Sequence, residues 1–250
     1  MLDVSGLTLS YGAEPVLEGA NLSVETGQFV SLVGPSGSGK SSLLRAIIGL
    51  QRPSAGTVTC DLDRRDLGIL FQDDALLPWR TALDNVALGL RIRGKPRPHA
   101  RDEAEAWLGR LGLDGFGERF PRALSGGQRK RVALAQVLAL RPRLLLMDEP
   151  FAALDAIVRH RITQDLLDLV EGEKISVLLV THDLEEALVL SDVVYLLGQG
   201  PRARIRQRYE VPIPRPRDIV KTRTIPSFAP LLERLWLDLS AEVDIVRRVA

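Results

Sequence analysis

A glycine-rich segment, Gly34–Ser42 (GPSGSGKSS), carries the chemistry that is easiest to read from this sequence. Its glycines let the backbone curl so that successive N–H groups point inward, toward an anion. Lys40 is expected to reach the β- and γ-phosphates of a nucleotide, and the Ser41 hydroxyl is expected to ligate Mg²⁺. The residues predicted to hold the phosphates are Gly34, Pro35, Ser36, Gly37, Ser38, Gly39, Lys40, Ser41 and Ser42.

Two acidic residues, Asp148 and Glu149, directly follow the apolar run Leu144–Met147. A strand that ends in water would explain one acid. Two in succession, in a chain that also has a phosphate loop, indicate metal and water chemistry. We expect Asp148 to hold the hydration shell of Mg²⁺, and Glu149 to orient or deprotonate the attacking water.

Gln72 and His182 stand near the ends of two further apolar runs, Leu67–Phe71 and Ser176–Val180. In an open α/β sheet, ligands bind at the carboxyl ends of the strands. The plainer interpretations are a capping glutamine and a histidine whose polar atoms are satisfied within the fold. Because both residues are expected at the same sheet edge as the two acids, we predict that His182 contacts the γ-phosphate.

A second glycine-rich segment, Leu124–Gln128 (LSGGQ), precedes a helical pattern at Arg129–Leu140. Ser125 occupies a natural N-cap position. The segment has no lysine inside its loop, yet the free N–H groups of a helix N-terminus bind anions readily. It is therefore a second candidate phosphate contact.

Tyr11 precedes Gly12 in a predicted turn between two strands. One interpretation is an aromatic residue that is half buried at the edge of a sheet. The other is a ring that stacks on a nucleotide base, which suits an amphipathic aromatic side chain.

Apolar and alternating runs predict the strands that must carry these residues. Alternation over Met1–Val24 indicates two or three short antiparallel strands. Together with the helices expected between them, the strands predict an α/β fold. Further strands are expected at Phe29–Val33, Thr57–Thr59, Leu67–Phe71, Leu144–Met147, Ser176–Val180 and Asp192–Leu197, the last being the final strand.

Helical spacing of apolar residues begins directly after the phosphate loop and recurs between the strands. Thr81–Leu111 is expected to be helical, interrupted by a basic loop at Gly94–His99 in which His99 is solvated. Further helices are expected after Asp155, at Leu184–Leu190 and, as a short amphipathic helix, at Pro226–Leu239.

Length and composition limit the class of protein. The 250 residues suffice for one large domain or two small ones, and 45% hydrophobic with 26% charged residues is ordinary for a globular chain. A formal net charge of +1 gives no global field that favours nucleic acid. Cys60 is the single cysteine, which excludes an internal disulfide and a multi-cysteine zinc site. We find no signal peptide and no apolar run of about 18 to 20 residues.

The segment Pro201–Arg217 is rich in arginine. It would suit a basic patch for lipid headgroups or nucleic acid. A run of this kind is more often an exposed edge hairpin with a solvated face, and we favour that interpretation.

Taken in order, these motifs resemble the ATP-binding subunit of ABC transporters over about residues 1–210. The most specific part of the resemblance is Leu124–Gln128, since phosphate loops occur in many unrelated ATPases. The resemblance implies a P-loop NTPase cassette with a mainly parallel core sheet, an N-terminal antiparallel β subdomain and a helical subdomain inserted at about residues 80–140. Residues 211–250 would form a short C-terminal extension.

The resemblance also implies a role for each matching residue, with ATP and Mg²⁺ as the bound groups. Tyr11 would stack on adenine, and Gln72 would sense Mg²⁺ and the nucleophilic water. Asp148 would support Mg²⁺ together with Ser41 and Gln72, and Glu149 would be the catalytic base. Asp155 would lie at the dimer interface, and His182 would be the γ-phosphate switch. The residues implied to bind ATP held by the opposite subunit are Ser125, Gly126, Gly127 and Gln128.

Three partners are implied by the same resemblance: a polytopic membrane permease, a second copy of the chain and a solute-binding protein. The protein would then lie at the cytoplasmic face of the inner membrane, held there by the permease, with no nucleic acid bound. The importers of nitrate, sulfonate and taurine are the most similar group, on four segments of this chain. These segments are Phe71–Trp79, Asp84–Leu90, Asp148–Asp155 and Pro214–Arg217.

The chain departs from the family in three places: at Ala153, at Gln136 and in the short span Gly56–Leu67. Two other functions are weighed beside the transporter subunit. Ala153 stands where the family often has serine. A soluble ABC-type ATPase that acts on ribosomes or DNA is the alternative function, although one cassette and one cysteine favour it less. A nucleotide switch that does not hydrolyse ATP is the third, and Glu149 and His182 argue against it.

Overall fold

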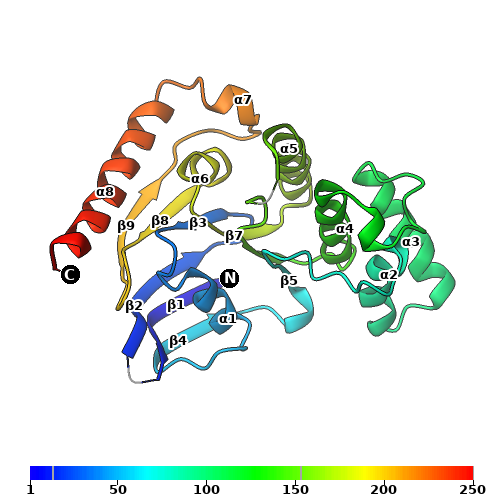
Figure 1. The fold of residues 1–250 in the computed structure, drawn as a ribbon, viewed down its shortest axis with the longest axis horizontal. Coiled ribbons are helices and arrows are strands. Elements are labelled where there is room, and N and C mark those ends of the chain that lie inside the picture. The colour runs from blue at the N-terminus through cyan, green and yellow to red at the C-terminus, as the bar shows by residue number, and fades with distance from the viewer. Residues whose placement is uncertain (13, 153, 250) are drawn as a thin grey trace. The chain divides into compact units, whose positions relative to one another are not determined.

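The strands that carry the predicted site residues fall into two separate units of the chain. The computed structural model describes residues 1–12, 14–152 and 154–249, with side chains described as far as residue 242. Unit 1 combines Met1–Arg64 with Val170–Ala250, and unit 2 is Arg65–Leu169. Their helices and strands are labelled in Figure 1.

A parallel sheet forms the centre of unit 1. Strand β3 (Phe29–Val33) pairs in parallel with β7 (Ser176–Thr181) on one side and β8 (Val193–Leu197) on the other. Every residue of these three strands is buried, which explains why each reads as a continuous apolar run rather than as an alternation. The predicted parallel core is confirmed.

The predicted antiparallel N-terminal sheet is also confirmed. Strands β1 (Leu2–Tyr11) and β2 (Glu14–Val24) pair antiparallel, and β4 (Ala55–Cys60) pairs antiparallel with the other edge of β1. Alternate side chains such as Leu2 and Val4 are buried, as expected of a sheet with one face toward a core.

The prediction that the strand ending at Leu197 is the final one was wrong. A further strand, β9 (Ile205–Glu210), runs antiparallel to β8 within the arginine-rich segment. It was missed because three of its six residues are charged and its apolar alternation is weak. Part of the predicted edge hairpin is therefore present, and β9 lies beside the C-terminal helix in Figure 1.

Arg217 contradicts the expectation of a solvated arginine-rich face. The residue is 3% exposed. Its guanidinium donates to the carbonyl of Ser191 (2.6 Å) and to that of Ile213 (2.9 Å), and it pairs with the Asp192 carboxylate (3.2 Å). Burial lowers the pKa of Arg217 to about 10, although the Asp192 charge opposes that shift. Arg217 thus closes the C-terminal segment onto the loop before β8.

Unit 1 also holds helices α1 (Lys40–Ile47), α6 (Leu184–Leu190), α7 (Ile219–Thr222) and α8 (Phe228–Val249). Helix α8 is longer than the helix predicted at Pro226–Leu239. No glycine or proline follows Leu239 to stop it, and alanine, glutamate and arginine there favour its continuation.

Unit 2 has one parallel strand pair, β5 (Leu67–Leu70) with β6 (Leu144–Asp148). Between them the chain forms helices α2 (Ala82–Ile92), α3 (Arg97–Arg110) and α4 (Gly126–Leu138), which pack on one another. Two short 3-10 turns lie at Arg64–Asp66 and Pro121–Ala123, and helix α5 (Ala156–Glu173) begins in this unit.

The basic loop predicted at Gly94–His99 is shorter than expected. Helix α3 begins at Arg97, so His99 is an exposed helical residue rather than a loop residue. Pro98 is compatible with this start, because proline lacks only an N–H that the first turn of a helix leaves unpaired. Over the described residues, no helix combines the length and the apolar character that crossing a membrane requires.

Candidate functional site

The phosphate loop leaves the carboxyl end of β3 and enters α1, as its sequence predicts. The Lys40 ammonium donates to the carbonyl oxygens of Gly34 (2.8 Å) and Pro35 (2.7 Å). These contacts fold the lysine back over the start of the loop, where its charge favours an anion together with the N-terminus of α1.

Two glycines of the loop are required by its shape. A Cβ at Gly34 would lie 2.6 Å from the Leu197 carbonyl oxygen, so the strand end of β8 leaves no room for a side chain. Gly39 is the N-cap of α1 and has φ +93°, a left-handed conformation that glycine adopts without strain. Glycine at these two positions therefore lets the loop pack against the end of β8 and turn into α1.

His182 lies at the same sheet edge as the phosphate loop. The register pairs Val33 with Thr181, so Gly34 and His182 each follow the end of one of two neighbouring strands. His182 is exposed, and the next residue, Asp183, caps α6 by accepting from the Glu186 N–H (3.0 Å). Unit 1 therefore brings together two of the features that the sequence assigned to the phosphates, the phosphate loop and His182.

Tyr11 is 54% exposed, and its hydroxyl is tied to α1. The hydroxyl donates to Gln51 Oε1 (2.9 Å) and lies 3.1 Å from Ser42 Oγ. The hydrogen bond with Ser42 lowers the pKa of the tyrosine. The ring is held next to the helix that begins at the phosphate loop, with much of its surface left for another molecule.

Unit 2 gathers a second group of predicted residues by the same geometry. The β5–β6 register pairs Leu70 with Met147, so Gln72 and the acids Asp148 and Glu149 come after neighbouring strand ends. Glu149 has φ +42°, which is rare for a residue with a long side chain. Strained backbone of this kind clusters at functional sites, where it aims a side chain.

Ser125 caps α4 as predicted, and the helix starts three residues earlier than expected because its glycines form the first turn. The Ser125 hydroxyl accepts from the Gln128 N–H (3.2 Å), while Gln128 Oε1 accepts from the Ser125 N–H (2.9 Å). This is a capping box. A Cβ on Gly127 would lie 2.5 Å from Val158 of α5, whereas a Cβ on Gly126 would meet only Arg129 Nη2, at 3.8 Å.

Asp155 lies at the start of α5. Its carboxylate accepts from the Val158 N–H (3.0 Å), and the side chain is exposed. This position leaves its predicted interface role open to test. Ala153, one of the departures noted in the sequence, lies outside the described residues.

Two residues that the sequence did not single out join Gln72 to α4. The Lys130 ammonium donates to the Gln72 carbonyl (3.1 Å) and lies 3.1 Å from Asp74 Oδ1. Lys130 is 3% exposed. A usable signal was present, since Lys130 stands three and four residues before Ala133 and Leu134, on the buried face of the helix.

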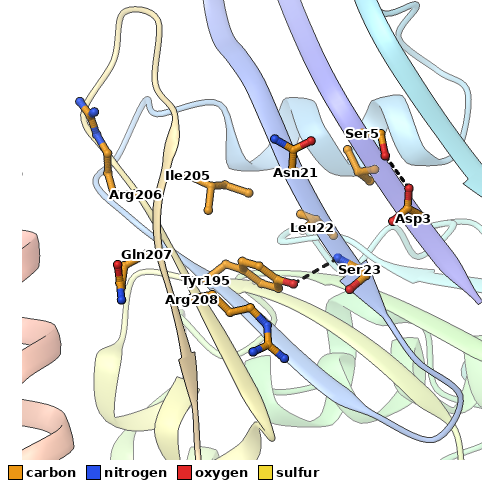
Figure 2. A pocket seen from close by; sticks show the side chains of 11 residues that line it. Asp3, Ser5, Asn21, Leu22, Ser23, Tyr195, Ile205, Arg206, Gln207 and Arg208 are labelled. Atoms are coloured by element: carbon orange, nitrogen blue, oxygen red, sulfur yellow. Dashed lines mark hydrogen bonds between the residues drawn. The ribbon is translucent and has the colours of Figure 1, made fainter.

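A separate groove of about 540 Å³ opens in unit 1 between β2 and β9 (Figure 2). Tyr195 lies at its centre, with its hydroxyl accepting from the Ser23 N–H (3.3 Å). Its two arginines already pair within the chain, Arg206 with Glu242 (2.9 Å) and Arg208 with Glu210 (2.8 Å). No residue that lines it belongs to the predicted nucleotide site.

The residues predicted to hold magnesium have suitable ligand atoms. The Ser41 hydroxyl, the Gln72 amide and the Asp148 carboxylate supply hard oxygen atoms, which Mg²⁺ prefers. Magnesium commonly takes one or two carboxylates and completes its shell with water and substrate phosphates. The described side chains contain no group of three or more His, Cys, Asp or Glu placed to hold a metal ion.

Comparisons with known proteins show the family to which the chain belongs. The model of the ABC transporter family matches residues 17–152. The taurine import ATP-binding protein TauB of Yersinia pestis is 44% identical over 80% of this chain and 81% of its own length. The nitrate import ATP-binding protein NrtD of a Synechocystis species is 42% identical over 85% of this chain and 82% of its own.

Among solved structures, the dimeric ATP-binding cassette MJ0796, bound to ADP and phosphate in a post-hydrolysis state, is similar. Its TM-score is 0.75 at 35% identity, over 84% of this chain and 99% of that one. The fold of most of this chain therefore has a counterpart in a solved ATP-binding cassette.

Proposed function

The chain belongs to the ABC transporter family and is an ATP-hydrolysing cassette, and from this premise we propose that it drives import of a small anionic solute across a membrane. The observation that carries the proposal is the pair of strand registers. Val33 with Thr181 sets His182 beside the phosphate loop, and Leu70 with Met147 sets Gln72 beside the two acids. Each register supports the proposal, because it brings residues that are distant in sequence to one end of neighbouring strands.

Within the proposed site, the Gly34–Ser42 backbone and the Lys40 ammonium bind the phosphates of ATP. Ser41, Gln72 and Asp148 hold Mg²⁺, which supplies charge neutralisation for the transferred phosphoryl group. Glu149 orients the attacking water and accepts its proton, and His182 contacts the γ-phosphate. Tyr11 offers the exposed face of its ring to the adenine base.

The second copy of the chain completes the site in this proposal. Ser125, Gly126, Gly127 and Gln128 form an anion-ready helix N-terminus without a lysine, which suits a phosphate already held by another subunit. The open space around Gly126 supports this role, because among the described residues a Cβ there would meet only Arg129 Nη2, at 3.8 Å. Asp155 then lies at the interface. The dimeric MJ0796 cassette shows that similar chains pair.

Three further parts of the proposal concern the assembly. We assign residues 1–210 to the cassette, with about 80–140 as its helical insertion and 211–250 as a C-terminal extension. A polytopic permease holds the protein at the inner face of the membrane, and a solute-binding protein delivers the solute. Trp79 supports a protein partner in unit 2, since it is 71% exposed close to Gln72 in sequence.

The proposed solute is a sulfonate such as taurine, or nitrate. This choice rests on relatives that carry those names and match over four fifths of the chain. Recognition of the solute itself would reside in the permease and the solute-binding protein.

A tagged pull-down from gently solubilised native membranes tests the proposal. We expect a polytopic membrane protein to be recovered at about equal stoichiometry, and a solute-binding protein encoded with it to bind a sulfonate or nitrate in a calorimeter. Recovery of ribosomes or DNA without a membrane protein would instead establish the soluble ATPase as the function.

A further inference from the structure

Lys130 of helix α4 is buried, and the acceptors around its ammonium all belong to one loop. Its ammonium lies 3.1 Å from Asp74 Oδ1, 3.1 Å from the Gln72 carbonyl oxygen and 3.4 Å from that of Phe71. An ammonium has three donors, and these three acceptors match them. All of them belong to the segment that leaves β5 and carries the Gln72 side chain.

Arg129 adds a second link between the same two elements. Its Nε lies 3.3 Å from Asp74 Oδ2, and its Nη1 donates to the Leu124 carbonyl (2.9 Å). Asp74 therefore receives one cation on each carboxylate oxygen. The following residue, Ala75, has φ +51°, so the loop is held in a conformation that its sequence alone disfavours.

The position of Lys130 in α4 gives this link a functional consequence. The helix begins at the Ser125–Gln128 capping box, so Lys130 stands within the second turn from the predicted γ-phosphate contact. A helix moves as a rigid rod over so short a distance. A displacement of its N-terminus would therefore be transmitted to the Gln72 backbone through the hydrogen bond from Lys130 to the Gln72 carbonyl, and to the same loop through the ion pair with Asp74.

We propose that Lys130 and Asp74 are a positioning pair that couples the glycine-rich end of α4 to Gln72. A phosphate contact at Ser125–Gln128 then sets the position of Gln72 at the site where Mg²⁺ and water are held. Lys130 touches neither nucleotide nor metal, and it acts through Gln72. The inference rests on the site assignments made under the proposed function.

The test measures steady-state ATP hydrolysis by the full-length protein, alongside ATP binding to the same variants. Lys130→Met keeps an apolar stem of similar length but removes the charge. We expect kcat to fall about 10-fold or more, with the affinity for ATP within twofold of wild type, because the phosphate loop is untouched. Lys130→Arg, which retains charge and donors, should recover part of the rate.

Arg131→Met is the matched control. Arg131 is the next residue of α4, and its Nη1 also donates to a backbone carbonyl, but to that of Leu111 (3.2 Å) in the helical region. The substitution removes the same kind of bond from the same helix without touching the Gln72 loop. We expect its kcat to stay within twofold of wild type. Asp74→Asn, at a partly exposed site, provides a second test if Lys130→Met does not fold.

The double variant Lys130→Met with Gln72→Ala separates the possible outcomes. If the pair acts through Gln72, the double variant hydrolyses ATP no more slowly than Gln72→Ala alone. Multiplicative losses, or equal losses in Lys130→Met and Arg131→Met, would overturn the inference while leaving the proposed function intact. A normal rate for Gln72→Ala would instead overturn the assignment of Gln72 on which the inference rests.

Discussion

Glu149 combines a carboxylate at a strand end with a backbone conformation that long side chains rarely adopt. Its φ of +42° follows directly on the buried strand β6, whose parallel pairing with β5 leaves little freedom. Such strain costs of the order of 1 to 3 kcal/mol and persists only where the surroundings impose it. The conformation therefore supports the hypothesis that Glu149 has a functional role.

Glu149→Gln should lower the rate of ATP hydrolysis about 10²- to 10⁴-fold, because the amide is unable to accept the proton of the attacking water. ATP binding should persist, since the phosphate loop is unchanged. A phosphate-release assay with nucleotide-binding titrations measures both effects. Glu118→Gln is the control: its partner is the Arg101 guanidinium, and the substitution should leave the rate unchanged. Equal rates in the two variants would remove Glu149 from the mechanism.

The two glycines of the α4 N-terminus are expected to respond differently to alanine. Gly127→Ala forces a Cβ to within 2.5 Å of Val158 and should destabilise the protein by about 1 to 3 kcal/mol. Gly126→Ala has space and should leave stability within about 0.5 kcal/mol of wild type while still reducing hydrolysis. Urea unfolding and ATPase assays distinguish them. Full activity in a stable Gly126→Ala protein would argue against a phosphate contact there.

At the scale of elements, the C-terminal segment is fastened to the parallel sheet by buried polar groups. Arg217 and Arg215 converge on Asp192, whose carboxylate also accepts from the Phe29 N–H (2.8 Å) at the start of β3. Tyr209 of β9 donates to Asp238 of α8. These contacts explain how an arginine-rich, proline-rich segment becomes ordered without a continuous apolar face.

Arg217→Met should lower the free energy of unfolding by about 2 to 4 kcal/mol, because it leaves three backbone carbonyls, those of Val189, Ser191 and Ile213, without their donor in a buried site. Chemical denaturation followed by circular dichroism measures the change. Arg223→Met provides the comparison: its pairing with Glu185 is solvent-exposed, and a change of under about 0.5 kcal/mol is expected. Similar losses in both variants would contradict a specific role for the buried guanidinium.

Tyr209 predicts a stability change at alkaline pH. Burial, reinforced by the Asp238 carboxylate, raises the pKa of Tyr209 well above its usual value of 10.0. Below pH 10 the phenol is neutral in both states and its stabilising effect is complete. Above pH 10 only the unfolded chain ionises readily, so stability falls with a slope approaching about 1.4 kcal/mol per pH unit.

Tyr209→Phe lacks this ionisation, so its stability should fall less steeply between pH 10 and 12 than that of wild type. Urea unfolding of both proteins at several pH values provides the measurement. A difference in stability that stays constant from pH 8 to pH 12 would show that the native and unfolded states ionise alike.

At the scale of the whole molecule, each of the two units carries an incomplete set of groups. Unit 1 holds the phosphate loop and His182, while unit 2 holds Gln72, the two acids and the anion-ready N-terminus of α4. The proposed mechanism uses groups from both sets, and in that proposal a second copy supplies the phosphate contact that has no lysine. Such a dimer would close and open during each catalytic cycle. A membrane partner could then respond to each of the two states.

Glu149→Gln with saturating Mg·ATP should double the 27.5 kDa mass seen by light scattering, because ATP that is not hydrolysed holds two chains together. Adding Ser125→Arg should abolish the dimer, since a large side chain then fills the α4 N-terminus. ADP in place of ATP is the nucleotide control and should leave a monomer. A monomeric Glu149→Gln protein under saturating Mg·ATP would contradict the shared site.

Much of the candidate site was open to prediction because its chemistry is local. A phosphate loop needs glycines, a lysine and a serine at fixed spacing between a strand and a helix, and Gly34–Ser42 has them within nine consecutive residues. The acids at Asp148 and Glu149 and the N-cap at Ser125 are likewise defined by their immediate neighbours. The strands β3 and β6 were found because continuous apolar runs mark strands buried on both faces.

Contacts between distant segments were decided only by the tertiary structure. The sequence shows a lysine at position 130 and an aspartate at position 74, but not that they meet, since helical periodicity reveals the buried face of Lys130 and not its partner. The burial of Arg217 depends on carbonyls of Ser191 and Ile213 whose positions follow from strand order. Local spacing specifies which groups can do chemistry, while pairing register and packing specify which of them come together.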